Sequence, residues 1–160
     1  MRSSRVASAV LAATVMALLV SACGATPDRG SPGTATCVGS GSHVEVVVET
    51  GGGHVVDRCV AFPGRTIKGE AALRKSGIEY ATEHFSYGDA VCQLDHDPTS
   101  YTACFATGQP YWALFLWSGG KWKSATTGIG QVILRSGQAL GWRYDPSTGA
   151  APPPPRPPRA

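Results

Sequence analysis

The chain has 160 residues and a formal net charge of +3 at pH 7, with 16% charged and 42% hydrophobic residues. This length is sufficient for one domain of typical size. From residue 34 to residue 148 nine Lys and Arg stand against ten Asp and Glu, so the positive charge lies at the two ends. No basic run interleaved with aromatics is present, which excludes nucleic acid as a predicted partner.

Residues 1–22 predict an export signal. Arg2 and Arg5 precede fifteen apolar residues, too few to span a bilayer but typical of a signal-peptide core. The core ends in Val-Ser-Ala before Cys23, which resembles the lipobox of bacterial lipoproteins. We therefore expect lipid on Cys23 and a membrane-anchored protein on the extracytoplasmic face. The alternatives are an ordinary signal peptide followed by a chance Cys, or an uncleaved anchor.

Both ends of the mature chain predict unpacked segments. Residues 23–36 contain no large apolar side chain, which indicates a flexible tether. Residues 149–160 are rich in Pro and predict a disordered, extended polyproline II tail that acts as a spacer. The alternative for the tail is a ligand for a proline-recognition domain.

The remaining cysteines predict a disulfide framework within a domain at residues 37–148. Cys37, Cys59, Cys92 and Cys104 are an even number in an exported chain, and four Cys allow three connectivities. We favour Cys92–Cys104, which closes a short loop rich in turn residues, and by elimination Cys37–Cys59. No CxxC spacing supports a zinc or redox site.

The first half of the domain predicts a hairpin followed by one helix. Residues 43–49 predict a half-buried strand with Val44, Val46 and Val48 on one face and Glu45 and Glu49 on the other. Residues 51–53 predict a Gly turn and residues 55–60 the second strand. Residues 68–76 are rich in helix formers, and Gly77 follows them as a left-handed C-cap. Residues 90–94 predict a further strand.

The second half predicts three or four strands with short turns. Residues 111–117 carry no charge and predict a central strand buried on both faces. Shorter strands follow near residues 121–123 and 131–135, and a last one at 139–144. Because the turns are too short for crossover helices, we predict an α+β fold with a small, mainly antiparallel sheet, one short helix and disulfide staples.

The order of these parts resembles the transcobalamin-like C-terminal domain, including a group of actinobacterial lipoproteins of unassigned function. The matching residues are the Val-rich hairpin, Ala72-Leu73, Gly77, Val91-Cys92, Pro98, Cys104, Tyr111-Trp112, Gly137 and Trp142-Arg143-Tyr144. In B12 carriers this domain closes on a corrinoid held against a larger helical domain, which has no counterpart here. The resemblance implies corrinoid binding without full affinity. Gln138 departs from the family's frequent Asp.

Motifs for catalysis are lacking, so we predict a protein that is not an enzyme and has no cofactor. No nucleophile elbow occurs, and the cysteines are accounted for. Asp95, His96 and Asp97 form the densest acid–imidazole group. The side chains of adjacent residues seldom all point at one ion. We therefore interpret this segment as a turn before Pro98 and not as a metal site.

The aromatic residues are the candidates for function. Flat π surfaces suit a planar ligand, and the candidate ligand-binding residues are Tyr111, Trp112, Trp122, Trp142 and Tyr144. We expect most of them in the core, Trp112 among them, and Trp122 at a groove or rim because two Lys flank it. The predicted function is capture of a small molecule, a corrinoid or other vitamin, for a membrane transporter. The alternative is an envelope protein–protein interaction module.

Overall fold

The computed structural model describes Cys37, residues 39–145 and residues 152–159. The predicted signal peptide, the lipidation site at Cys23 and the tether lie outside these residues. Within the described part of the chain, no helix is long and apolar enough to cross a membrane.

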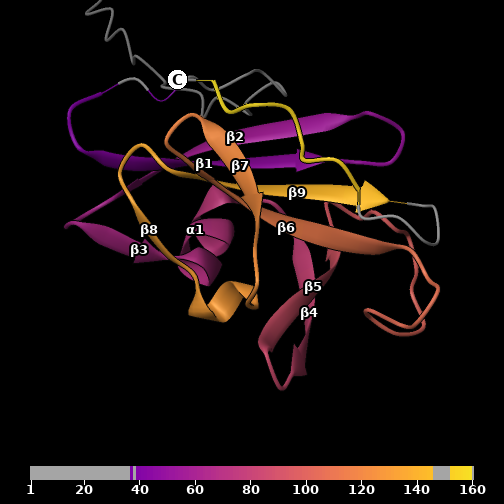
Figure 1. The fold of residues 1–160 in the computed structure, drawn as a ribbon. Helices are drawn as coiled ribbons and strands as arrows, with labels where there is room; N and C mark the ends of the chain where they lie inside the picture. The colour runs from indigo at the N-terminus through magenta and orange to yellow at the C-terminus, as the bar shows by residue number, and fades with distance from the viewer. Residues whose placement is uncertain (1–36, 38, 146–151, 160) are drawn as a thin grey trace, which may run out of the picture. The chain divides into compact units, whose positions relative to one another are not determined.

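Nine strands, one α-helix and one 3-10 helix make up the described structure (Figure 1). The elements are β1 Ser42–Glu49, β2 Val55–Phe62, β3 Thr66–Lys68, α1 Gly69–Ser76, β4 Tyr80–Phe85, β5 Gly88–Leu94, β6 Tyr111–Ser118, β7 Lys121–Ser124, η1 Ile129–Gln131, β8 Ile133–Arg135 and β9 Ala139–Asp145. The protein is mainly β, so the α+β prediction holds only in the coarse sense that one short helix accompanies mostly antiparallel sheets.

A five-stranded sheet in the order β2-β1-β9-β6-β7 forms the main layer. The β1–β2, β6–β7 and β6–β9 pairs are antiparallel, whereas β1 and β9 are parallel, with Glu45 opposite Ala139. The prediction of a central strand at 111–117 is wrong. The centre is β9, because the first strand of the chain pairs with the last one and displaces β6 by one place.

The inner face of this sheet packs on α1 and holds the main core. Val44, Val46 and Val48 of β1 point inward and are fully buried, as are Ala72 and Leu73 of the helix. The helix ends at Gly77, whose φ of 73° is left-handed and favours glycine, as predicted.

Two smaller sheets, β3–β8 and β4–β5, complete the fold. β4 was not predicted, because its residues are mostly exposed and show no alternation of apolar and polar side chains. The disulfides pair Cys37 with Cys59 and Cys92 with Cys104, with Cα atoms 5.3 and 5.0 Å apart. This is the favoured connectivity.

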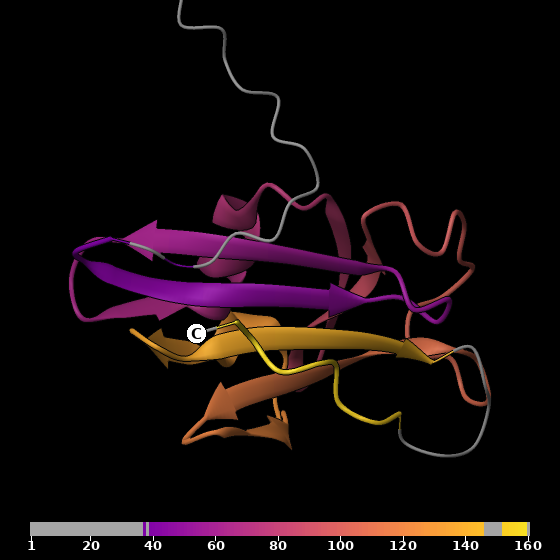
Figure 2. The same ribbon diagram turned by 90° about the horizontal axis from the view of Figure 1, so that it is seen from above.

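The outer face of the five-stranded sheet is covered by residues 152–159 of the Pro-rich tail, which the sequence analysis had predicted to be unpacked. Figure 2 shows this segment, in yellow, running along β9. Pro152 and Pro155 are buried and Pro158 is half-buried, whereas Pro153 and Pro154 are exposed. A polyproline II helix repeats every three residues, so one of its three sides faces the sheet.

Candidate ligand-binding cavity

A cavity of about 310 Å³ opens between β5, β6 and the segment that leads into η1. The rings of Tyr87, Phe105 and Tyr111 line it, together with Trp112 and Trp142 from the sheet. Trp112 and Trp142 are 2% and 1% exposed, so the cavity borders the buried core at these two residues.

Four aromatic side chains, Phe85, Tyr87, Phe105 and Tyr111, form a continuous cluster that we call the aromatic rim. Phe85 stacks on Tyr87 with ring centroids 5.2 Å apart, and Phe105 lies 4.9 Å from Tyr111. Phe105 also contacts Phe85 and Tyr87 edge-on, at 6.4 Å in each case. Tyr87 and Phe105 are 42% and 41% exposed, which places them at the opening of the cavity.

The backbone at Phe105 is strained, with a φ of 56°. A bulky residue rarely adopts this left-handed conformation, and residues held in it occur often at functional sites. The segment is fixed by the Cys92–Cys104 disulfide and by the N–H of Cys104, which donates to Oε2 of Glu83 at 3.1 Å. The neighbouring disulfide therefore holds the Phe105 ring at the rim.

Another wall of the cavity depends on Gly128, which lies in the segment before η1. The N–H of Gly128 donates to the carbonyl of Tyr87 at 2.9 Å. A Cβ at Gly128 would lie 2.6 Å from the backbone N of Asp89, so no larger residue fits without a shift. This close approach keeps the segment before η1 against the β4–β5 hairpin.

The cavity has few polar groups. Asp89 lines it and lies 2.7 Å from Nδ1 of His84, and Thr126 and Thr127 add hydroxyls. Burial, and next the negative charge of Glu83, raise the pKa of Tyr87, so its phenol stays protonated. The lining suits a neutral or weakly polar ligand with a flat apolar surface.

A second cavity of about 250 Å³ lies beside the first, next to the Cys92–Cys104 loop. Tyr111 and Trp112 line both cavities, and Tyr144 lines only the second. The indole of Trp112 donates to the carbonyl of Asp97 at 3.0 Å and lies 5.0 Å from the Tyr144 ring. Trp112 therefore belongs to the core, as expected, while also forming a wall of each cavity.

The structure brings together only part of the predicted ligand-binding set. Tyr111, Trp112, Trp142 and Tyr144 lie at the two cavities, whereas Trp122 lies on the outer face, 5.3 Å from Trp117 and half-buried under the tail. Phe85, Tyr87 and Phe105 were not predicted from the sequence. Their only signal was their position next to a turn or a disulfide, because no strand or helix periodicity marks them.

No metal site follows from the clustered ligand atoms of the described residues. Glu83, Cys92 and Cys104 bring ligand atoms within 4.8 Å of one another, but both sulfurs belong to one disulfide and offer no thiolate. The segment 95–97 forms a turn, with the N–H of Asp97 donating to Leu94, as predicted. His96 points to Glu79, at 3.0 Å.

Comparison with known proteins gives a fold match alone. No family model matches the chain, and no curated protein matches it significantly. A solved structure from Ruminococcus gnavus ATCC 29149, described as a "putative metal binding protein", is similar with a TM-score of 0.51 and 18% identity. The match covers 68% of this chain and 99% of that one. The resemblance to transcobalamin-like domains stays a prediction, and the chain shares its fold with the R. gnavus protein.

Proposed function

We propose that this protein is a lipid-anchored, extracytoplasmic module that binds a small, flat, largely apolar molecule in the cavity behind the aromatic rim. The observation that carries the proposal is the cavity itself, about 310 Å³ in volume, with two large aromatic rings, Tyr87 and Phe105, left more than 40% exposed at its opening.

Exposed aromatic clusters are costly in a monomeric protein unless they serve recognition. Each ring presents a large apolar surface to water, and a bound planar molecule would cover it at little cost in side-chain entropy. The left-handed backbone of Phe105 also supports the proposal, because residues held in this conformation occur often at functional sites.

The cavity volume favours a ligand of one or two rings. Sites for small molecules span roughly 300–1,000 Å³, and this cavity lies at the lower limit. A corrinoid, which the sequence resemblance implies, is much larger and would rest across the rim instead of entering. Delivery of the ligand to a membrane transporter remains part of the proposal.

The test is titration of intrinsic Trp fluorescence, since Trp112 and Trp142 line the cavity. The panel holds small aromatic heterocycles, corrinoids and glycans. We expect at least one heterocycle to bind, and Phe105→Ala to weaken it about tenfold or more. Ile133→Ala is the matched control, because Ile133 is 57% exposed but lies in the β3–β8 sheet.

Two results would contradict ligand binding at the rim. One is a panel without any saturable response. The other is an equal loss of affinity in Phe105→Ala and Ile133→Ala, which would mean that any exposed apolar side chain has the same effect.

The anchor is tested separately. The two disulfides fit an oxidising compartment, and the lipobox-like segment supports modification of Cys23. We expect Cys23→Ser to move the protein from the membrane fraction to the soluble fraction. Unmodified wild-type protein in the soluble fraction would disprove the anchor and leave the cavity proposal untouched.

A protein partner is the second candidate for the aromatic rim, and Tyr101, 43% exposed at the second cavity, is the observation that favours it. Interface hot spots are rich in exposed aromatics. The concave site supports the small ligand over a partner, which would fit a flat or convex patch better.

A further inference from the structure

The outer face of the five-stranded sheet holds an acidic surface, made by Glu45 and Glu49 of β1 and Asp57 of β2, beside the indoles of Trp117 and Trp122. All three carboxylates contact the tail. The tail lies on the side of the sheet opposite α1 (Figures 1 and 2). None of these five side chains lines the cavity behind the aromatic rim, although Pro152 at the start of the tail segment does.

The acidic surface contacts the guanidinium groups of the tail. Nη2 of Arg156 donates to Oδ2 of Asp57 at 2.7 Å, and Nε of Arg159 lies 3.9 Å from the same oxygen. Charged hydrogen bonds of this kind are stronger than neutral ones and favour Arg over Lys when the geometry is planar.

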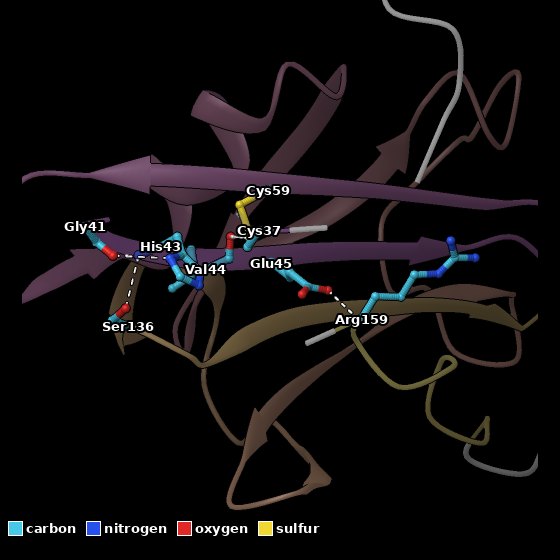
Figure 3. The surroundings of a disulfide bond; sticks show 8 residues. All are labelled: Cys37, Gly41, His43, Val44, Glu45, Cys59, Ser136 and Arg159. Carbon is cyan, nitrogen blue, oxygen red and sulfur yellow. Dashed lines mark hydrogen bonds between the residues drawn. A yellow bond between two sulfur atoms is a disulfide. The ribbon is translucent and has the colours of Figure 1, made fainter. Parts of the chain in front are cut away.

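The same surface also binds the tail's backbone. The N–H of Arg156 donates to Glu49 at 2.9 Å, and the N–H of Arg159 donates to Glu45 at 2.7 Å (Figure 3). The indole of Trp122 donates to the carbonyl of Arg156 at 3.2 Å. An extended polyproline segment has no internal hydrogen bonds, so these groups depend on external partners. The two arginines are three residues apart, which places them on one side of such a helix.

A groove for the prolines runs beside these contacts. A Cβ on Gly141 would lie 2.7 Å from Cγ of Pro155 and 2.6 Å from Cη2 of Trp122, so the glycine makes room for both rings. Pro158 lines a cavity of about 180 Å³ together with Trp117 and Ala139. The absence of a side chain at Gly141 thus leaves room for Pro155, and the space beside Trp117 lies next to Pro158.

Burial under the tail is deep. Asp57 is 3% exposed and Glu45 is 6% exposed. Oδ1 of Asp57 and Nε of Arg156 are buried and have no hydrogen-bond partner. Buried carboxylates are strongly unfavourable unless a cation pairs with them. The tail both covers these carboxylates and supplies the cations Arg156 and Arg159, which lie against Asp57.

We propose that this surface is a recognition site for an extended proline-rich peptide carrying Arg-x-x-Arg, and that the chain's own residues 152–159 are its resident ligand. The tail is joined to β9 by residues 146–151 only. A short linker gives an effective concentration of about 1 mM, so even a modest intrinsic affinity keeps the site filled. A peptide of the same chemistry enters only when the tail leaves.

The experiment uses the full chain and a fluorescein-labelled peptide with the sequence of residues 150–160. Arg156→Gln/Arg159→Gln removes both guanidinium groups from the tail. The control is Arg65→Gln/Arg135→Gln, which changes the charge equally at two exposed arginines away from the tail. By fluorescence anisotropy we expect the tail variant to bind the peptide at least about tenfold more tightly than the wild type or the control.

Peptide chemistry and amide exchange give two further readouts. A peptide with both Arg replaced by Lys should bind more weakly, and one with Gln at both positions should not bind. In the wild type, the amides of Arg156 and Arg159 should exchange more slowly than in the free peptide.

Three outcomes would overturn the proposal. They are equal peptide binding by wild type and tail variant, no binding by a tail variant that melts like the wild type, and wild-type amides that exchange at free-peptide rates. The first and third mean that the tail does not fill the site, and the second means that the surface is not a peptide site.

Discussion

The two faces of the five-stranded sheet are built from the same strands but are closed in different ways. The inner face presents Val44, Leu140 and Trp142 to the main core, and its contacts are apolar. The outer face presents Glu45, Asp57 and Trp122 to the tail, and its contacts are ion pairs and hydrogen bonds. Alternation along each strand separates the two sets of side chains.

This difference shows that one sheet can carry stability on one side and recognition on the other. Apolar burial is non-directional and contributes in proportion to area, so the inner face stabilises the fold. A buried ion pair gains little net free energy but rejects mismatched partners, so the outer face selects what covers it. The predictions that follow test this division, beginning with the largest effect.

Truncating an inner-face indole should be the most damaging change. Trp142 is 1% exposed, and Trp142→Ala should lower the free energy of unfolding by about 3–5 kcal/mol. Trp122→Ala, on the outer face, should cost less than half as much, because the tail can move away and water can fill the gap. Urea denaturation of both variants measures this difference, and equal losses would remove the distinction between the faces.

Loss of the Cys92–Cys104 disulfide should come next. It closes a loop with a sequence separation of 12, so Cys92→Ser/Cys104→Ser should cost about 3 kcal/mol by the loop-entropy relation. Because Phe105 follows Cys104, ligand binding at the aromatic rim should weaken as well. Tail contacts should be unchanged, as amide exchange at Arg156 would verify.

A methyl group at Gly141 should act on the outer face alone. Gly141→Ala would push against Trp122 and Pro155, and overpacking costs typically about 1–3 kcal/mol. We expect the lower end of that range, with a red shift of Trp emission as the tail lifts off. Gly52→Ala is the control, since its nearest atom outside its chain neighbours is 3.9 Å away. An unshifted emission maximum would show that the tail does not lie on Trp122.

The pH dependence of Asp57 should be the smallest effect. Burial raises its pKa above the ordinary 3.8, and Arg156, Arg159 and Arg58 only partly oppose this shift. A raised folded-state pKa means that the stability contributed by Asp57 is full below pH 3.8 and is lost as the pH rises through the folded pKa. The wild type should therefore lose stability relative to Asp57→Asn between pH 3.5 and 7, as urea titrations would measure. A constant difference would contradict the shift.

Much of the inner face could be predicted from the sequence. The Val repeat of β1 and the helix ended by Gly77 depend on local spacing and were predicted correctly. The two disulfides were also predicted correctly, Cys92–Cys104 from its short loop and Cys37–Cys59 by elimination. The parallel pairing of β1 with β9 could not be predicted. It joins segments more than ninety residues apart, and the short turns near β9 pointed only to antiparallel neighbours.

The sites were less predictable, for a different reason. Phe105 and Tyr87 lie in turns, where no periodicity shows which way a side chain points. For the outer face the sequence was misleading. Glu45 alternates with Val44 and Val46 as a water-facing residue would, and the Pro-rich tail has no apolar pattern typical of a packed segment. The ion pair between Arg156 and Asp57 in the structure shows that the carboxylates of the sheet pair with the arginines of the tail.

The end of the tail lies beside the start of the domain, because Pro158 and Cys37 line the same small cavity. The two ends of the domain thus lie close together, and a circular permutation of residues 37–159 that joins Arg159 to Cys37 and opens the chain at residues 146–151 should keep the fold. In such a permutant the proline segment would lead directly into the Cys37–Cys59 disulfide. A covalent bond to the disulfide-linked Cys37 would then fix the Arg159 end of the proline segment. In the natural chain, polar contacts from Arg159 to Glu45 and Asp57 hold that end.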